Sequence, residues 1–219
     1  MAAHHRAPIR ELAARAHDGL DDQVGLPADL LVPVHGSIGR AARERCGATG
    51  DSARFVALVR RHIKDLYGVD PDAPRESSPV LCEACGAAAL KPTTVLFGAN
   101  LPKEFFARKA QDLPGTNLVI TAGTSLVVSP ANSIVRDAPA AALRLVVNQE
   151  PVGQDLGLSY GLGELASRDL FAQGDCESVF LALIVELGWL EDLTARLPSL
   201  PAASQRLVHL AQAQRKARS

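Results

Sequence analysis

The sequence predicts an α/β protein with a parallel sheet and a small inserted module that carries cysteines. Short apolar runs alternate with helical patterns along much of the chain, which is typical of parallel sheets connected by helices. A pair of cysteines two residues apart lies in a stretch that interrupts this alternation. Of the 219 residues, 47% are hydrophobic but only 4% are aromatic, so the core is expected to be mainly aliphatic.

The first half of the chain predicts three elements before the cysteine pair. Residues 8–16 have the composition of a short helix that ends at the turn-rich residues 18–22. Residues 30–35 form a compact apolar run between Asp29 and Gly36, which favours a buried strand. From Ser52 to Tyr67 apolar residues recur at helical spacing, and Gly68 is placed to end that helix.

The second half of the chain continues the alternation of strands and helices. Predicted strands cover residues 93–97, 117–122, 143–147 and 169–172. Predicted helices cover residues 103–111, 129–135 and 177–187, and Pro130 suits the first turn of the second. The carboxyl ends of parallel strands meet at one edge of a sheet, so residues that follow these strands are expected to lie close together.

Composition and charge exclude several classes of protein. The formal net charge of −1 gives no overall attraction to nucleic acid or to an anionic membrane. No apolar run reaches the roughly 18 residues of a membrane-spanning helix. The basic residues 212–219 are expected to form a solvated tail. A zinc-ribbon nucleic-acid binder is an alternative that this charge and the scarcity of aromatic residues disfavour.

Three cysteines indicate a metal site. Cys82 and Cys85 have the C-x2-C spacing at which two thiolates hold one metal, and Cys46 is the upstream partner. A structural zinc takes four ligands, and a matching pair would place the fourth thiolate at Arg43, which has no lone pair to offer. Four cysteines in a chain of this length favour metal binding in a reducing compartment over a disulfide framework.

Two polar segments follow predicted strands. The first, Gly123-Thr124-Ser125, offers a glycine for close backbone approach and two hydroxyls for phosphate or ribose oxygens. The second, Asn148-Gln149-Glu150, offers acidic and amide groups for ribose hydroxyls. Each segment alone also fits a plain turn, but together, on consecutive strands, they favour a nucleotide cleft. His35 ends an apolar strand and is a candidate general base, with a structural role as the alternative.

Five blocks, in order and at similar spacing, resemble the sirtuin family. They are VPVHGSIGRAARERCG (32–47), CEACGAAALKPTTVLFGANLP (82–102), NLVITAGTSLVVSPA (117–131), VVNQEP (146–151) and DCESVFLALIVELGW (175–189). The ending Gly174-Asp175-Cys176 with Glu186 to Trp189 resembles the eukaryotic branch that includes the cytoplasmic tubulin and histone deacetylase. The resemblance implies a partial Rossmann-like parallel sheet with an inserted small zinc-ribbon module.

The resemblance also implies a reaction and the residues that perform it. Sirtuins are transferases that use NAD to remove acetyl from protein lysine, releasing nicotinamide and O-acetyl-ADP-ribose. The resemblance implies that His35 is the base acting on a ribose hydroxyl, and that an acetylated-lysine protein or peptide is the partner. It implies zinc ligands at Cys46, Cys82 and Cys85, and peptide pairing along Val95, Leu96, Phe97 and Gly98. The implied NAD-contacting residues are Asp18, Gly123, Thr124, Ser125, Asn148, Gln149, Glu150 and Cys176.

The chain departs from the family pattern near its start. Sirtuins begin with a strand and a glycine-rich loop for the NAD pyrophosphate, and residues 1–17 match neither. Of the family's Gln-Asn-x-Asp block only Asp18 remains, and Ala99 replaces a glutamate after Phe97-Gly98. We therefore expect an N-terminally shortened sirtuin. A catalytically inactive remnant that serves as a peptide-binding or interaction module is the alternative, and for Cys176 so is a merely structural buried role.

The expected organisation follows from these matches. Residues 1–17 match nothing, residues 43–95 form the zinc-binding module with its helix, and residues 194–219 form a polar, basic tail. Residues 18–42 and 96–193 form an incomplete Rossmann-like NAD-binding domain. The expected location is cytoplasmic, nuclear or both, with no direct nucleic-acid or membrane contact, and the oligomeric state is left open.

Overall fold

The computed structural model describes residues 12–14, 26–37, 41–43, 46, 49–50, 52–82, 84–88, 90–95, 100–161 and 168–218. The chain divides into two compact units, Met1–Asp112 and Leu113–Ser219. Within the described residues no helix is both long enough and apolar enough to cross a bilayer.

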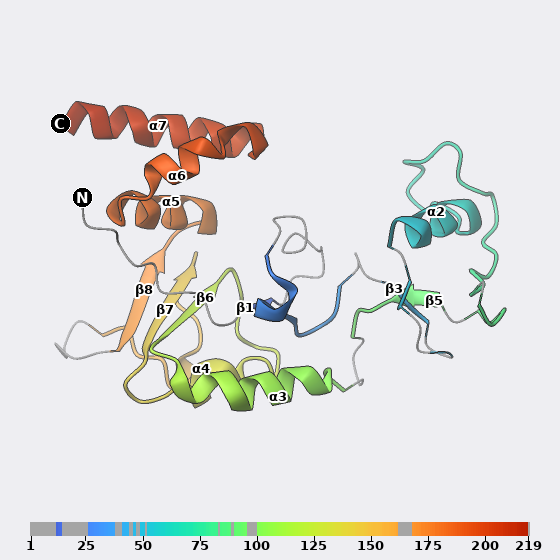
Figure 1. Ribbon diagram of the computed structural model, residues 1–219, viewed down its shortest axis with the longest axis horizontal. Helices are drawn as coiled ribbons and strands as arrows, with labels where there is room; N and C mark the ends of the chain where they lie inside the picture. Colours follow the sequence, from blue (N-terminus) through green and yellow to red (C-terminus); the bar gives the residue numbers. More distant parts are fainter. Residues whose placement is uncertain are drawn as a thin grey trace. The chain divides into compact units, whose positions relative to one another are not determined.

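The second unit is built on a parallel sheet of β6 (Leu118–Ala122), β7 (Leu143–Asn148) and β8 (Asp169–Gln173), in the order β6-β7-β8 (Figure 1). Leu118 pairs with Leu143, and Arg144 pairs with Asp169, so the three strands run in step and end together. The central strand supplies Val146 and Val147, which are almost completely buried. This register places the residues that follow the strands at one edge.

Two short helical elements share a core with β7. They are α4 (Ser133–Asp137) and the 3-10 turn η3 (Gln154–Leu156), which contact each other. The core here is aliphatic, as the composition predicts. Its buried residues are Leu126, Val135, Val146 and Leu158, and the partly buried residues packed on them are Val152, Leu156, Tyr160 and Phe171.

Three helices follow β8: α5 (Cys176–Glu186), α6 (Leu190–Ala195) and α7 (Ala202–Arg218). In Figure 1 they form a stack beyond the arrowheads of the strands, and α7 contacts both α5 and α6. A short 3-10 turn, Leu197–Ser199, connects α6 to α7. The polar, basic tail predicted for residues 194–219 contains helix α7, in which Val208 is buried.

The described residues of the first unit form two small sheets. Strand β1 (Leu12–Ala14) pairs in parallel with β2 (Leu31–Pro33), which follows the 3-10 turn η1 (Ala28–Leu30). Strand β3 (Ala41–Arg43) pairs antiparallel with both β4 (Thr49–Gly50) and β5 (Leu90–Pro92). Helix α2 (Ser52–His62) belongs to the loop between β4 and β5, and α3 (Lys103–Asp112) closes the unit.

Several predicted elements differ from the observed ones. The helix predicted over residues 8–16 is wrong at Leu12–Ala14, because pairing with β2 places these residues in a strand. The helix predicted over residues 52–67 ends at His62. The carboxylate of Asp65 accepts the N–H groups of Tyr67, Val69 and Asp70 and holds the chain in a turn.

Two other boundaries also move. The strand predicted over residues 93–97 is observed at Leu90–Pro92, and Thr93 to Val95 are not in strand conformation. The helix predicted from residue 129 begins at Ser133, because turns such as Ser133 N–H to Pro130 O occupy the preceding residues. The predicted α/β class with a parallel sheet is confirmed.

Candidate functional site

A glycine turn follows β6 at the carboxyl edge of the sheet. The Gly123 N–H donates to Val147 O at 3.0 Å, and its φ of +61° is a conformation that glycine adopts readily. The Thr124 hydroxyl accepts the N–H of Leu126, and the Asn132 side chain donates to Leu126 O. These bonds fix the turn so that its backbone and hydroxyls lie beyond the end of the strand.

Asn148 connects the ends of all three strands. Its side-chain amide donates to Thr124 O at 3.1 Å, and its side-chain oxygen accepts the N–H of Gln149. Its backbone oxygen accepts the N–H of Gly174, which follows β8. The structure therefore brings together the turn after β6, the end of β7 and the entrance to α5, as the sequence analysis expected.

Cys176 is the first residue of α5 and lies against the Gly123 turn. A Cβ built on Gly123 would come within 3.2 Å of the Cys176 sulfur, so a side chain at residue 123 would displace that cysteine. Asp175 caps the helix, and the Ser178 N–H bonded to its carboxylate lowers the pKa of Asp175. Ser125, Gln149 and Glu150 are exposed around this edge.

This edge has the chemistry of a nucleotide site. It combines a glycine that permits close approach, two hydroxyls, amide groups and one carboxylate, all following parallel strands. Such groups can bond ribose hydroxyls and phosphate oxygens without any metal. The donor set therefore fits a dinucleotide of the kind that the sequence analysis expected.

His35 lies in the first unit, in a turn directly after β2. The Gly36 N–H donates to Pro33 O, and Gly36 has a φ of +72°. The His35 carbonyl accepts the N–H of Val95 at 2.9 Å, so the first residue of the predicted peptide-pairing segment lies beside the histidine. The other members of that segment, Leu96, Phe97 and Gly98, and the predicted NAD contact Asp18 lie outside the described residues.

Cys46, Cys82 and Cys85 form a cluster whose sulfur atoms all lie within 4.8 Å of one another. The Cys46 and Cys82 sulfurs are 4.0 Å apart, close to the ~3.8 Å edge of a tetrahedron with Zn–S bonds of about 2.3 Å. Bonds from Gly86 N–H to Cys82 O and from Cys82 N–H to Ala87 O form the knuckle. Three thiols thus fit three of the four zinc positions.

The cluster favours one thiolate. Burial disfavours the charged form of Cys82, but N–H groups of Cys85 and Ala84 outweigh it and lower the pKa of that thiol. For Cys85 the Ala87 N–H favours the thiolate, but the neighbouring Cys82 sulfur and burial together raise its pKa. Arg43, at the position of the absent fourth cysteine, is the end of β3 and pairs with Leu90.

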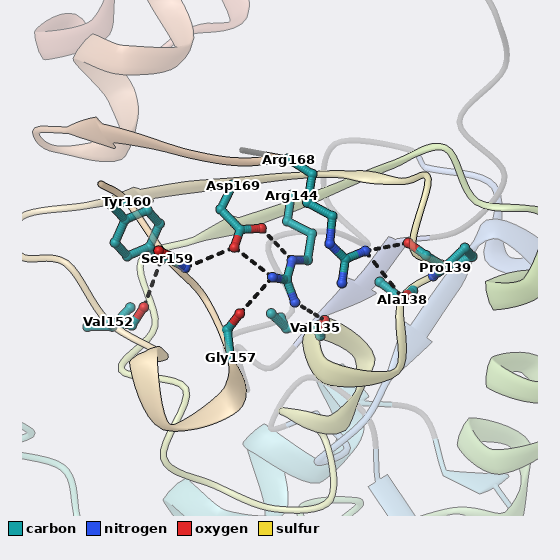
Figure 2. Close-up of polar contacts among 10 residues, drawn as sticks. All are labelled: Val135, Ala138, Pro139, Arg144, Val152, Gly157, Ser159, Tyr160, Arg168 and Asp169. Atoms are coloured by element: carbon teal, nitrogen blue, oxygen red, sulfur yellow. Dashed lines mark hydrogen bonds and ion pairs between the residues drawn. The ribbon is translucent and has the colours of Figure 1, made fainter. Parts of the chain in front are cut away.

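A buried ion pair near the amino ends of β7 and β8 was not anticipated from the sequence. Arg144 Nε and Nη2 each lie 2.6 Å from a carboxylate oxygen of Asp169, and both side chains are almost fully buried (Figure 2). Arg144 also donates to Val135 O and Gly157 O, and Asp169 accepts the N–H of Ser159. The available signal was an arginine inside the otherwise apolar run 143–147.

The ion pair is bonded to the described part of the segment between β7 and β8, at Gly157 and Ser159. The Tyr160 hydroxyl donates to Val152 O at 2.7 Å within that segment, and Arg168 donates to Pro139 O (Figure 2). Burial raises the pKa of Tyr160, and the charge of Asp169 adds to this effect. The network thereby holds the loop that begins with Asn148, Gln149 and Glu150.

A parallel sheet with polar groups at its carboxyl edge and a three-cysteine cluster define an α/β protein whose groups fit a nucleotide and a metal ion. Sequence comparison identifies the family: residues 5–130 match the Sir2 family. The chain therefore belongs to the Sir2 family, and its fold is a partial Rossmann-like sheet with an inserted zinc-ribbon-type module.

Curated relatives are similar along most of this chain. The NAD-dependent protein deacetylase sirtuin-2 of Danio rerio is 36% identical over 84% of this chain and 48% of its own length. The NAD-dependent protein deacetylase hst2 of Schizosaccharomyces pombe is 25% identical over 87% of this chain and 50% of its own. The NAD-dependent deacetylase sir2C of Dictyostelium discoideum is 30% identical over 83% of this chain and 38% of its own length. The chain thus spans half or less of the length of these relatives.

Proposed function

We propose that the protein is an NAD-dependent protein-lysine deacetylase of the sirtuin type, acting on acetylated protein or peptide. The observation that carries this proposal is the meeting of Gly123, Thr124, Asn148 and Cys176 at the ends of three parallel strands, in a chain of the Sir2 family. The names of the relatives point to the same activity.

The residues at this edge would bind and orient the cofactor. Backbone at Gly123 and the hydroxyls of Thr124 and Ser125 would face phosphate or ribose oxygens, and Asn148, Gln149 and Glu150 would bond ribose hydroxyls. Cys176 would contact the adenine end, and Asp18 is proposed as a further contact. When bound, NAD supplies the ADP-ribosyl acceptor for the acetyl group.

His35 would serve as the general base, taking a proton from a ribose hydroxyl. The acetylated peptide would bind as an extra strand along Val95 to Gly98, which gives backbone hydrogen bonds without dependence on peptide sequence. The bond between Val95 N–H and His35 O supports this assignment, because it connects the start of the peptide segment to the histidine.

Cys46, Cys82 and Cys85 would hold a structural zinc. This metal would stabilise the module formed by β3, β4, β5 and α2 and would take no part in the reaction. Free cysteines that bind metal require a reducing compartment, which supports the proposed cytoplasmic or nuclear location, or both.

The test is release of nicotinamide when the purified chain is mixed with NAD and an acetylated peptide. We expect release that depends on the acetyl group, together with O-acetyl-ADP-ribose detected by mass spectrometry. His35→Ala is expected to lower kcat by about 100-fold or more, the range of general-base catalysis. His209→Gln is the matched control, since His209 is exposed on α7 and bonds Gln212.

Absence of nicotinamide release from the parent chain would overturn the proposed activity. Binding of acetylated peptide without turnover would instead favour a non-catalytic peptide-binding protein. Equal activity of the His35→Ala and His209→Gln variants would show that His35 is not the base.

A further inference from the structure

We propose that Thr93 is a positioning residue for His35, acting through a hydrogen-bonded clamp on the turn that carries the histidine. This inference rests on the proposed role of His35. The clamp consists of Thr93 and Val95 on one side and of His35, Gly36 and Ser37 on the other, and all five residues lie in the first unit.

The Thr93 hydroxyl makes two hydrogen bonds with the backbone of Ser37. The Ser37 N–H donates to Thr93 Oγ1 at 3.1 Å, and the Thr93 hydroxyl donates to Ser37 O at 3.1 Å. Ser37 has only 3% of its surface exposed, so water does not replace these bonds cheaply. The Thr93 side chain thereby satisfies both polar backbone groups of a buried residue two positions after His35.

Backbone contacts extend the clamp to the histidine itself. The Val95 N–H donates to His35 O at 2.9 Å. A Cβ built on Gly36 would lie only 1.9 Å from Thr93 O, so the two segments are in direct backbone contact. With Gly36 N–H bonded to Pro33 O, residues 35–37 are held by backbone groups before and after them.

The clamp also has a fixed support. Thr93 follows β5 directly, and β5 pairs with β3 from Ala41↔Pro92 to Arg43↔Leu90. At the Arg43↔Leu90 end of this ladder, the chain continues from Arg43 to Cys46, and Cys85 precedes Leu90, so both strands connect to the cysteine cluster. Thr93 therefore transmits the position of a paired strand to the turn of His35, which is what a positioning residue requires.

The experiment compares Thr93→Val, Thr93→Ser and Thr94→Val in the full chain. Valine keeps the branched shape and removes the hydroxyl, serine keeps the hydroxyl, and Thr94→Val makes the same change one residue away. The rate of His35 modification by diethylpyrocarbonate, measured by peptide mass spectrometry, reports the histidine directly. His62 and His209 serve as internal references.

We expect Thr93→Val to change the His35 modification rate by at least threefold without altering the references. In the deacetylation assay it should lower kcat by about tenfold or more, with little change in the KM for NAD. Thr93→Ser and Thr94→Val should stay within twofold of the parent. If the parent shows no turnover, the proposed activity fails, yet the modification rates still test the clamp.

Two results would overturn the proposal. One is an unchanged His35 modification rate in a folded Thr93→Val protein. The other is a Thr93→Ser variant, folded by its circular dichroism, in which His35 reactivity departs from the parent by more than threefold, since the hydroxyl would then not be the cause. The serine variant decides the matter even if Thr93→Val does not fold.

Discussion

At the scale of single residues, two kinds of polar group have to be distinguished. Gly123, Asn148 and Cys176 lie at the carboxyl edge of the sheet, where their groups can meet a ligand. Arg144 and Asp169 lie near the amino ends of β7 and β8, away from that edge, and are buried against each other. Because their hydrogen bonds are to each other and to the backbone, we assign them to stability.

Asp169→Asn should destabilise the second unit strongly. The variant leaves Arg144 buried without a full counter-charge, and breaking such a pair costs about 3–5 kcal/mol. Chemical unfolding followed by circular dichroism measures the loss. Asp137→Asn is the matched control, because its partner Arg136 lies 2.8 Å away in an exposed ion pair, and we expect a loss below ~1 kcal/mol.

The same pair predicts how stability depends on pH. Burial alone would raise the pKa of Asp169, but the bonds from Arg144 and Ser159 outweigh it and lower that pKa. A lowered folded-state pKa gives stability above the unfolded value of about 3.9 that is lost as pH falls through the folded value. The stability gap between the parent and Asp169→Asn should therefore shrink below about pH 4. A gap that stays constant down to pH 2 would contradict this assignment.

At the scale of elements, the cysteine module depends on contacts that are far apart in the sequence. Cys46 follows β3 and Cys82 and Cys85 precede β5, so the β3–β5 ladder brings the three sulfurs together. The sequence predicted a metal site at these three cysteines, and the structure brings their sulfurs within 4.8 Å of one another. Zinc in such modules contributes several kcal/mol to folding.

Zinc content should depend on Cys46, Cys82 and Cys85 and not on Cys176, which lies outside the cluster. Elemental analysis of the purified parent should find zinc, Cys82→Ser should lose it, and Cys176→Ser should keep it. Arg43→Cys is expected to raise zinc affinity, because a fourth thiolate completes the tetrahedron. Equal zinc content in the parent and in Cys82→Ser would show that the cluster does not hold the metal.

Some elements were predictable because one local pattern determines them. Strands β6 and β7 are apolar runs bounded by polar residues, and both were predicted within one residue of their observed ends. The strand at Leu12–Ala14 was not predictable, because its conformation depends on pairing with β2. Likewise, the end of α2 depends on the Asp65 carboxylate, which competes locally with the helix.

The candidate site shows the same division. The position of Gly123, Thr124 and Asn148 at one sheet edge was predictable, since strand ends in a parallel sheet converge there. The Thr93 clamp was not, because its hydrogen bonds join residues 56 positions apart. Nor was the Arg144–Asp169 pair, because an arginine inside an apolar run does not indicate a partner 25 positions away.

At the scale of the whole molecule, the two units carry different proposed tasks. Met1–Asp112 carries the proposed base, the start of the peptide segment and the cysteine cluster. Leu113–Ser219 carries the proposed NAD-binding edge. The proposed deacetylation connects these tasks in one reaction, and its central claim is that the sheet edge binds NAD.

The most direct test of that claim is the affinity for NAD measured by titration calorimetry with three proteins: the parent, Gly123→Ala and Gly161→Ala. Gly123 has a φ of +61° and a built Cβ 3.2 Å from Cys176, whereas a Cβ on Gly161 meets nothing within 4 Å. We expect Gly123→Ala to weaken NAD binding about tenfold or more. Alanine at this positive φ has a conformational cost of ~1–2 kcal/mol, and its Cβ keeps the backbone from coming close to NAD. Gly161→Ala should bind like the parent. No binding of NAD by the parent, or equal affinity in all three proteins, would contradict the account.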